Sequence, residues 1–237
     1  MTTKRFVVTD EQKLTFLKRH QELMGRFLKG VVDPELTLYY LQQAMENINP
    51  FDYLIIPQIK SWEEFYQKYF GMRVDFSRII IPKHVLGFDR LIILVQGMMP
   101  QNTYDVCSHQ FKTDRGTGAL NQVIIYEDRS AKNGAYAIWV RDRVEADKEL
   151  RDKSADDLNQ ERISGITMTE RQLYELKYYD ETAGEHLDKR NVTLCSGSRF
   201  PDGHVPHIYC RDNEFRMDGF SPDSALSCLR AREVVSA

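Results

Sequence analysis

The sequence predicts an α+β fold: an N-terminal helical hairpin followed by a largely antiparallel sheet flanked by helices. Two helical patterns come first, and strand-like segments then follow one another across short turns. Long helices do not alternate regularly with strands, which argues against a doubly wound parallel sheet. We expect residues 1–48 to form the hairpin and residues 49–237 the α+β domain. One compact domain over the whole chain is the alternative.

The composition is that of a soluble globular protein with an ordinary core. Hydrophobic residues make up 42% of the 237 residues and charged residues 28%, and the net charge of −3 gives no overall attraction to nucleic acid or anionic membranes. The N-terminus lacks the apolar segment of a secretory signal, and the apolar run 91–95 is too short to cross a bilayer. The four widely spaced cysteines are expected to be reduced and mostly buried. These features predict a cytoplasmic protein without a membrane partner.

Two short patterns define the N-terminal hairpin. Thr9 and Gln12 have the spacing of a capping box, and Gly30 is placed to end the first helix. Asp33 followed by Pro34 is the typical start of a second helix. The hairpin is interpreted as a packing or docking unit, with partner binding as the alternative.

Proline and capping signals predict the next elements. Residues 51–59 carry a proline within an apolar run and are expected to be extended, and Ser61 with Glu64 then forms a capping box for a short helix. Residues 78–81 are predicted to be a short strand. Residues 90–95 lack polar alternation, so a central strand with both faces buried is expected there.

The middle of the chain is predicted to hold a helix and a β-hairpin. Pro100 starts a helix in which Cys107 faces the core. Residues 123–126 and 135–140 are rich in β-branched and aromatic side chains, and the Asn133–Gly134 turn between them predicts an antiparallel pair. The glycine-rich segment 113–120 is expected to be a mobile loop.

The last third is predicted to be charged, then helical, then mostly strand. Residues 141–157 carry interspersed charges of both signs and are interpreted as a solvated connector. Thr167 caps a helix that continues beyond Tyr179, and strands are expected within 191–210 and near 215–217. Ser221 followed by Pro222 predicts a final helix over Leu226 and Leu229.

Three motifs resemble a family of uncharacterised bacterial proteins found in many divergent copies. They are GFDRLI at residues 87–92, YAIWVRDRVEAD at 136–147, and LCSGSR at 194–199 followed by Asp202-Gly203 and Val205-Pro206. The resemblance covers about two thirds of the chain, from the segment around Trp62 to its end. It implies no activity, because the family has no assigned function.

Cysteine and histidine chemistry is the first candidate for the segment 191–210. His204, His207, Cys210 and Cys195 could supply zinc ligands, but strand residues three apart point to opposite faces and the spacing matches no zinc signature. No metal or other cofactor is therefore predicted. Cys195 with either histidine is the leading nucleophile pair, although no nucleophile-elbow sequence surrounds it.

The same segment offers an anion-binding turn, and the segment after Val140 offers carboxylates. Residues 196–199 (Ser-Gly-Ser-Arg) present backbone N–H groups, two hydroxyls and a guanidinium, although no Walker loop is present. Asp142, Glu145 and Asp147 could hold a catalytic metal, but arginines interleave with them and favour salt bridges. Trp139, followed by Arg141 and Arg143, is weak support for nucleic-acid binding, and the net negative charge makes such binding unlikely.

These comparisons favour a soluble, non-enzymatic binding module whose partner is another protein or a small anionic ligand. Its surface is predicted at the 196–203 turn together with the end of the Trp139 strand. The alternative is a small hydrolase or nuclease that uses Cys195 with a histidine, or the carboxylates after Val140. The predicted surface residues are Trp139, Arg141, Arg143, Ser196, Gly197, Ser198, Arg199 and Asp202.

Overall fold

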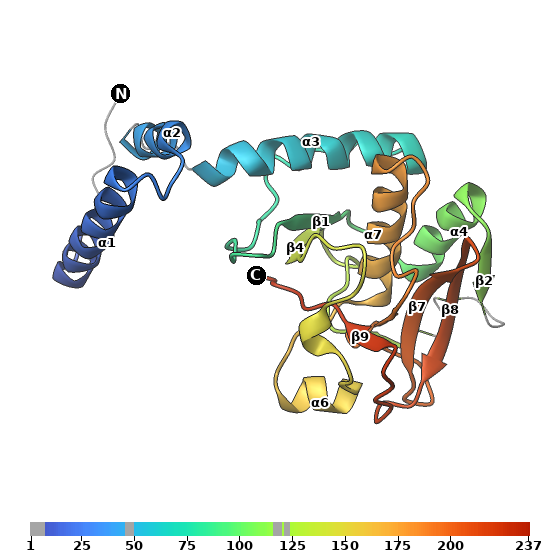
Figure 1. The fold of residues 1–237 in the computed structure, drawn as a ribbon. Coiled ribbons are helices and arrows are strands. Elements are labelled where there is room, and N and C mark those ends of the chain that lie inside the picture. The colour runs from blue at the N-terminus through green and yellow to red at the C-terminus, as the bar shows by residue number, and fades with distance from the viewer. Residues whose placement is uncertain (1–7, 46–49, 116–119, 121–123) are drawn as a thin grey trace. The chain divides into compact units, whose positions relative to one another are not determined.

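The computed structural model describes residues 8–45, 50–115, 120 and 124–237 and divides the chain into two compact units (Figure 1). The units are Met1–Pro57 and Gln58–Ala237. Their boundary lies within a helix, later than the boundary after residue 48 that the sequence predicts. The larger unit combines helices with a mixed sheet, so the predicted α+β class is confirmed.

The N-terminal unit contains two helices joined by a short turn. Helix α1 spans Asp10–Leu28 and begins with the predicted capping box, in which Thr9 and Gln12 exchange hydrogen bonds. Gly30 adopts a φ of +65°, a conformation that costs glycine little, and helix α2 spans Pro34–Met45. Both predicted N-terminal helices are therefore present.

Helix α3 corrects the prediction of an extended segment at 51–59. It spans Pro50–Phe70 without a break and contains Pro57. The expected capping box at Ser61 lies inside this helix, and the Ser61 hydroxyl instead accepts a hydrogen bond from Lys177 at 2.5 Å. The helix ends at the predicted place, before Gly71, whose φ is +65°.

Two strands form a small buried sheet. Strand β1 (Arg90–Leu94) pairs antiparallel with β4 (Tyr136–Val140), and β4 is bridged on its other edge by Val235. The prediction that β1 has two buried faces is confirmed, but β1 is not a central strand, because β4 is its only neighbour among the described residues. The predicted pairing of 123–126 with 135–140 is wrong: β3 (Tyr126–Glu127) pairs with β6 (Ser198–Arg199). Val123 lies outside the described residues.

The second sheet has five strands in the order β2-β8-β7-β5-β9. The β7–β8 and β5–β7 pairs are antiparallel, whereas the β2–β8 and β5–β9 pairs are parallel. The parallel pairs join strands from distant parts of the chain. The strands are β2 (Thr113–Arg115), β5 (Val192–Leu194), β7 (Val205–Arg211), β8 (Glu214–Phe220) and β9 (Leu229–Ala231).

Helix α7 (Met168–Glu181) lies at the centre of the larger unit. It runs between the β1–β4 pair and the β7–β8 hairpin, and it also contacts α4 (Pro100–Gln110) (Figure 1). Its first ten residues are buried, including four charged ones. A helix with polar residues buried on every side needs internal partners for them, and these partners organise the unit.

Several other predicted segments differ from the structure. Residues 78–81 are not a strand, and residues 113–115 form β2, while 116–119 of the predicted loop lie outside the described residues. The charged connector 141–157 contains η1 (Lys148–Leu150) and the start of α6 (Ala155–Gln160), and it contributes buried residues.

The predicted C-terminal helix is wrong. Ser221 bonds to Asp223 in a turn, and the Pro222 carbonyl accepts from the Asp156 N–H. Leu229 belongs to β9, which pairs with β5. The partners of these residues are distant in sequence, so the local capping signal does not decide their structure.

The described helices include none that is long and apolar enough to cross a membrane. All four cysteines are free thiols. Cys107, Cys195 and Cys210 are buried, as predicted for most of them, and Cys228 is exposed.

Candidate functional site

The Ser196–Arg199 turn packs tightly against the segment that leads into α7. A Cβ on Gly197 would lie 2.8 Å from the carbonyl oxygen of Gly165, so a larger residue would force the two backbones apart. The Gly197 N–H donates to the Ile166 carbonyl at 3.2 Å. Gly197 and Ser198 are buried and Ser196 is half-buried. Glycine at this position therefore serves the close approach of two chain segments.

The N-terminus of α7 already holds a carboxyl group from the chain itself. The Thr169 N–H donates to a Glu127 carboxylate oxygen at 3.1 Å, and the Thr169 hydroxyl donates to the same carboxylate. The Met168 N–H donates to the Ser198 hydroxyl at 2.8 Å. Because helix N-termini favour negative charge, Glu127 occupies the position that a bound anion would take.

Arg199 also has partners within its own turn. Its guanidinium donates to the Ser196 and Ser198 carbonyls, each at 2.7 Å. The Ser198 hydroxyl and the Arg199 guanidinium are thus engaged in anchoring α7 and shaping the turn, whereas the buried Ser196 hydroxyl has no hydrogen-bond partner among the described residues.

Glu127 has an unusual acidity for a carboxyl group. Burial raises its pKa from 4.5 to about 7, and the neighbouring Glu170 adds to the rise, while the hydrogen bonds from Thr169 and Ser198 oppose it. Glu170 itself is ion-paired with Arg129, which donates to both of its carboxylate oxygens at 2.7 and 2.8 Å. The site therefore titrates near neutral pH.

We expect the stability of the protein to fall as the pH rises from about 4.5 to about 7. Because the folded-state pKa of Glu127 exceeds its unfolded value, the folded chain holds the proton more tightly, and that stabilisation is lost above the folded-state pKa. The full change is about 3 kcal/mol at most. Urea unfolding of the wild type and Glu127→Gln across this range measures it.

The glutamine variant should lack this pH dependence, and Glu64→Gln, an exposed control, should retain it. A parallel pH profile for the wild type and Glu127→Gln would show that Glu127 titrates normally.

Trp139, Arg141 and Arg143 do not join the turn, so the predicted shared surface does not form. Trp139 is 1% exposed, and its indole N–H donates to the Pro82 carbonyl at 2.9 Å. Arg141 bridges Asp147 and Glu233, each at 2.7 Å.

Arg143 pairs with Glu149 at 2.6 Å. Among the described residues, no hydrogen bond or ion pair joins Trp139, Arg141 or Arg143 to the 196–199 turn. Trp139 instead packs in the core as part of β4, and the two arginines form ion pairs with carboxylates outside the β1–β4 pair.

The proposed nucleophile pair lacks the required ionisation. Cys195 is fully buried, and burial raises the pKa of its thiol far above neutrality. Burial also lowers the pKa of His207 to about 4, and its ring stacks on Phe220 with centroids 4.1 Å apart. A protonated thiol and a neutral imidazole packed in an aromatic stack are typical of a core.

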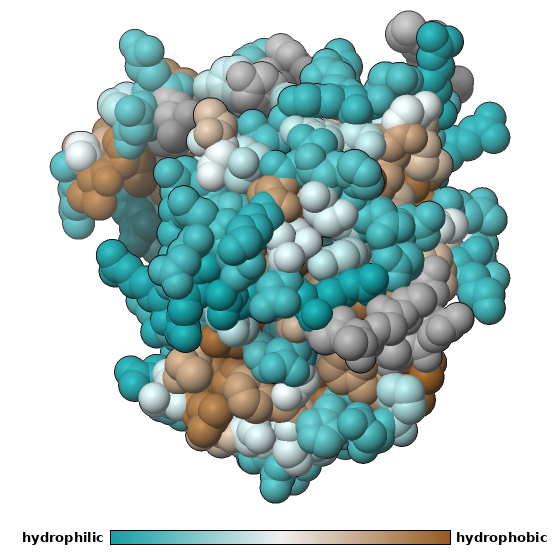
Figure 2. Space-filling view, turned by 90° about the vertical axis from the view of Figure 1, so that its right-hand side faces the viewer, coloured by the Kyte–Doolittle hydropathy of each residue, from teal (hydrophilic) through white to brown (hydrophobic). Residues whose placement is uncertain are grey.

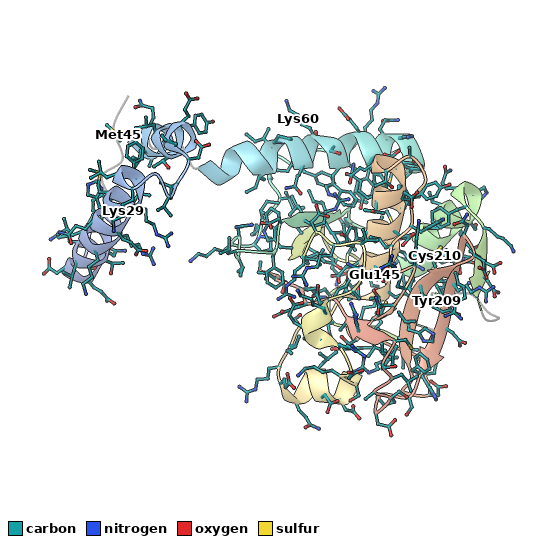
Figure 3. All side chains as sticks on the ribbon, in the orientation of Figure 1. Lys29, Met45, Lys60, Glu145, Tyr209 and Cys210 are labelled. Atoms are coloured by element: carbon teal, nitrogen blue, oxygen red, sulfur yellow. The ribbon has the colours of Figure 1, made fainter. Side chains whose placement is uncertain are left out.

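The remaining candidates for metal chemistry are dispersed. Asp142 accepts from the Tyr174 hydroxyl and Glu145 from the Asn191 amide, whereas Asp147 pairs with Arg141. In Figure 3, Tyr209 and Cys210 lie on β7, whereas Glu145 lies on the segment that follows β4. Within the described ranges, no three His, Cys, Asp or Glu side chains are grouped so that they could hold a metal ion.

A cleft of about 440 Å³ lies beside the second half of the predicted turn. Asp202 is the one predicted surface residue that lines it. The sequence signal for this position is the Asp202–Gly203 turn. The opposite wall is formed by β2 and β8, and the sequence did not predict that these strands lie beside the turn. The lining residues are Arg115, Leu120, Met168, Phe200, Pro201, Asp202, His204, Met217, Asp218 and Gly219.

Figure 2 shows apolar side chains gathered over the lower part of the face that carries α4, β2 and β8. Buried Met217 belongs to β8 on this side of the unit, and half-buried Phe200 belongs to the turn beside it. The cleft therefore combines an apolar floor with a charged rim.

A second polar cluster was missed by the sequence reasoning. Arg171, Glu175, Asp188 and Arg232 are all buried and ion-paired with one another. In the sequence, charged residues at helical spacing have the pattern of a solvent-exposed helix face. The burial of these four residues is therefore seen only in the structure. Their complete burial makes them part of the scaffold.

No family model, curated protein or solved structure matches this chain. The resemblance to an uncharacterised bacterial family thus stays a prediction, and the geometry of the cleft is the observation from which a function can be argued.

Proposed function

We propose that the chain is a non-enzymatic binding module that holds an apolar segment of a partner protein in the cleft beside residues 200–204. The cleft itself carries the proposal, since it joins buried apolar side chains to exposed charges. Sites of this kind use apolar contact for affinity and a few polar groups for orientation. The chain's free thiols fit a reducing compartment, so we place this binding in the cytoplasm.

The floor of the cleft suits flexible apolar side chains. Met168 and Met217 are buried beneath it, and methionine adapts readily to apolar ligands. The Phe200 ring lies against Gly219, where a Cβ would meet a ring carbon at 3.0 Å. Glycine thus allows the ring to approach the backbone of β8 closely.

The charges on the rim favour basic residues in the partner. Asp202 and Asp218 carry two negative charges, while Arg115 is the one arginine on the rim and its guanidinium lies 4.5 Å from the centroid of the Tyr104 ring. The backbone N–H of His204 donates to the Asp202 carboxylate and lowers the pKa of that group. The Asp202 carboxylate is therefore ionised at neutral pH. A small anionic ligand would meet repulsion here, and Glu127 already occupies the helix N-terminus.

Fluorescence polarisation with labelled hexapeptides tests this proposal. Peptides with a central Leu-Met pair flanked by lysines should bind more tightly than the same core flanked by glutamates. In the variant Asp202→Arg/Asp218→Arg, the preference should reverse, because the rim then attracts acidic flanks. We expect a change of at least tenfold in the ratio of the two dissociation constants.

The matched control is Glu64→Arg, which reverses an exposed charge on α3 away from the cleft residues. It should leave the ratio unchanged. An equal affinity for both peptide types in the wild type, or the same ratio in the double variant, would exclude this cleft as the binding surface.

A further inference from the structure

Helix α1 presents an apolar stripe to solvent. None of its residues is buried, and Leu14, Leu17 and Met24 expose 55%, 55% and 45% of their surface. Leu28 exposes 77%. Single exposed apolar residues are common, but these four lie along one side of the helix over about four turns and together mark an interaction surface.

The stripe has the spacing of a coiled-coil seam. Leu14, Leu17, Gln21, Met24 and Leu28 are separated by three, four, three and four residues, which places them at successive a and d positions of a heptad. The seam is distinct from the face that α1 turns toward α2.

That second face contains Phe16 and Leu23, which line a gap of about 610 Å³ together with Leu41 of α2. The α1–α2 contact therefore leaves the heptad seam uncovered. A hairpin of this length without a buried residue on its longest helix does not supply a core of its own.

We propose that the α1 seam pairs with the α1 seam of a second copy of this chain, in antiparallel orientation. The pairing buries Leu17 against Leu28 of the second copy and Met24 against Gln21. It is independent of the cleft beside residues 200–204, since the residues that form the two surfaces do not overlap.

The charges beside the seam select the antiparallel orientation. With Leu14 at position a, Lys13 occupies a g position and Lys18 the following e position. A parallel pair would bring Lys13 of each copy next to Lys18 of the other, which places like charges together twice. The antiparallel pair instead places Lys18 beside Gly25 of the second copy and aligns the helix dipoles favourably.

Sedimentation equilibrium of the full chain tests the pairing. The wild type should be a dimer at micromolar concentration, and Leu17→Glu should raise the dimer dissociation constant at least a hundredfold. Arg26→Gln is the matched control, because it changes the net charge by the same amount at an exposed residue that belongs neither to the seam nor to the gap beside α2, and it should leave the dimer intact. A monomeric wild type, or equal dissociation constants for the two variants, would overturn the proposal.

Disulfide trapping tests the orientation, in a Cys228→Ser background that removes the exposed native thiol. Leu17→Cys and Leu28→Cys proteins should cross-link when mixed and oxidised, and neither should cross-link alone. Cross-linking of Leu17→Cys by itself would show parallel pairing and overturn the antiparallel arrangement.

Discussion

Replacing Asp188 by asparagine is expected to lower the free energy of unfolding by about 3–5 kcal/mol, because it removes one partner of a buried ion-pair network. Asparagine keeps the shape of the side chain and tolerates the φ of 52° at this position, so the loss reports the charge. Chemical denaturation of both proteins at neutral pH measures the difference.

The contacts of Asp188 explain the size of this effect. Its carboxylate accepts from Arg171 at 2.8 and 3.0 Å, from Arg232 at 2.8 Å and from the Ala146 N–H at 2.8 Å. Both guanidiniums are buried, and they join α7 to the segment that follows β9. Without the carboxylate, Arg232 loses its ion-pair partner.

The effect should also depend on pH. Burial alone would raise the pKa of Asp188, but Arg232 and Arg171 outweigh it and hold the pKa below its usual range. A lowered folded-state pKa gives stability that is present above the unfolded pKa and lost as the pH falls through the folded-state pKa. The difference in free energy of unfolding between wild type and Asp188→Asn should therefore become smaller as the pH falls.

The control is Asp156→Asn, at an exposed position, which should change the free energy of unfolding by less than about 0.5 kcal/mol. Equal stabilities for wild type and Asp188→Asn would contradict the network.

Local signals in the sequence located the helix starts whose partners are close in sequence. Thr9 and Thr167 each bond to a residue three positions later, and both capping boxes are present in the structure. The capping-box signal failed at Ser61, whose hydroxyl accepts from Lys177 inside α3, and the Ser-Pro signal failed at Ser221, because Leu229 joins a parallel strand pair. Tertiary partners decide these two cases, and a local pattern does not contain them.

The candidate site was only partly predictable for the same reason. The Ser196–Arg199 motif does mark a close contact, since Gly197 meets Gly165, but the contact is internal. The cleft near Asp202 depends on β2 and β8, which are about a hundred residues apart and pair in parallel. Pairing between such distant segments leaves no periodic trace in a single sequence.

The burial of Trp139 leads to the second large expected effect. Trp139→Ala should lower the free energy of unfolding by about 3–5 kcal/mol, the usual cost of removing a large aromatic side chain from a core. The indole is 1% exposed, its N–H donates to the Pro82 carbonyl, and its ring meets His84 edge to face at 5.2 Å. Thermal and urea unfolding measure the loss.

Two matched variants test whether the loss of stability in Trp139→Ala comes from core packing. Trp139→Phe keeps most of the ring and loses the indole hydrogen bond, so it should cost less than the alanine variant. Tyr126→Ala removes an aromatic side chain that is 55% exposed and should cost under about 0.5 kcal/mol. If Trp139→Ala were as stable as Tyr126→Ala, the indole would lie at the surface, where the sequence placed it for partner binding. The expected order, with alanine at position 139 the least stable, assigns this tryptophan to the core that supports β4.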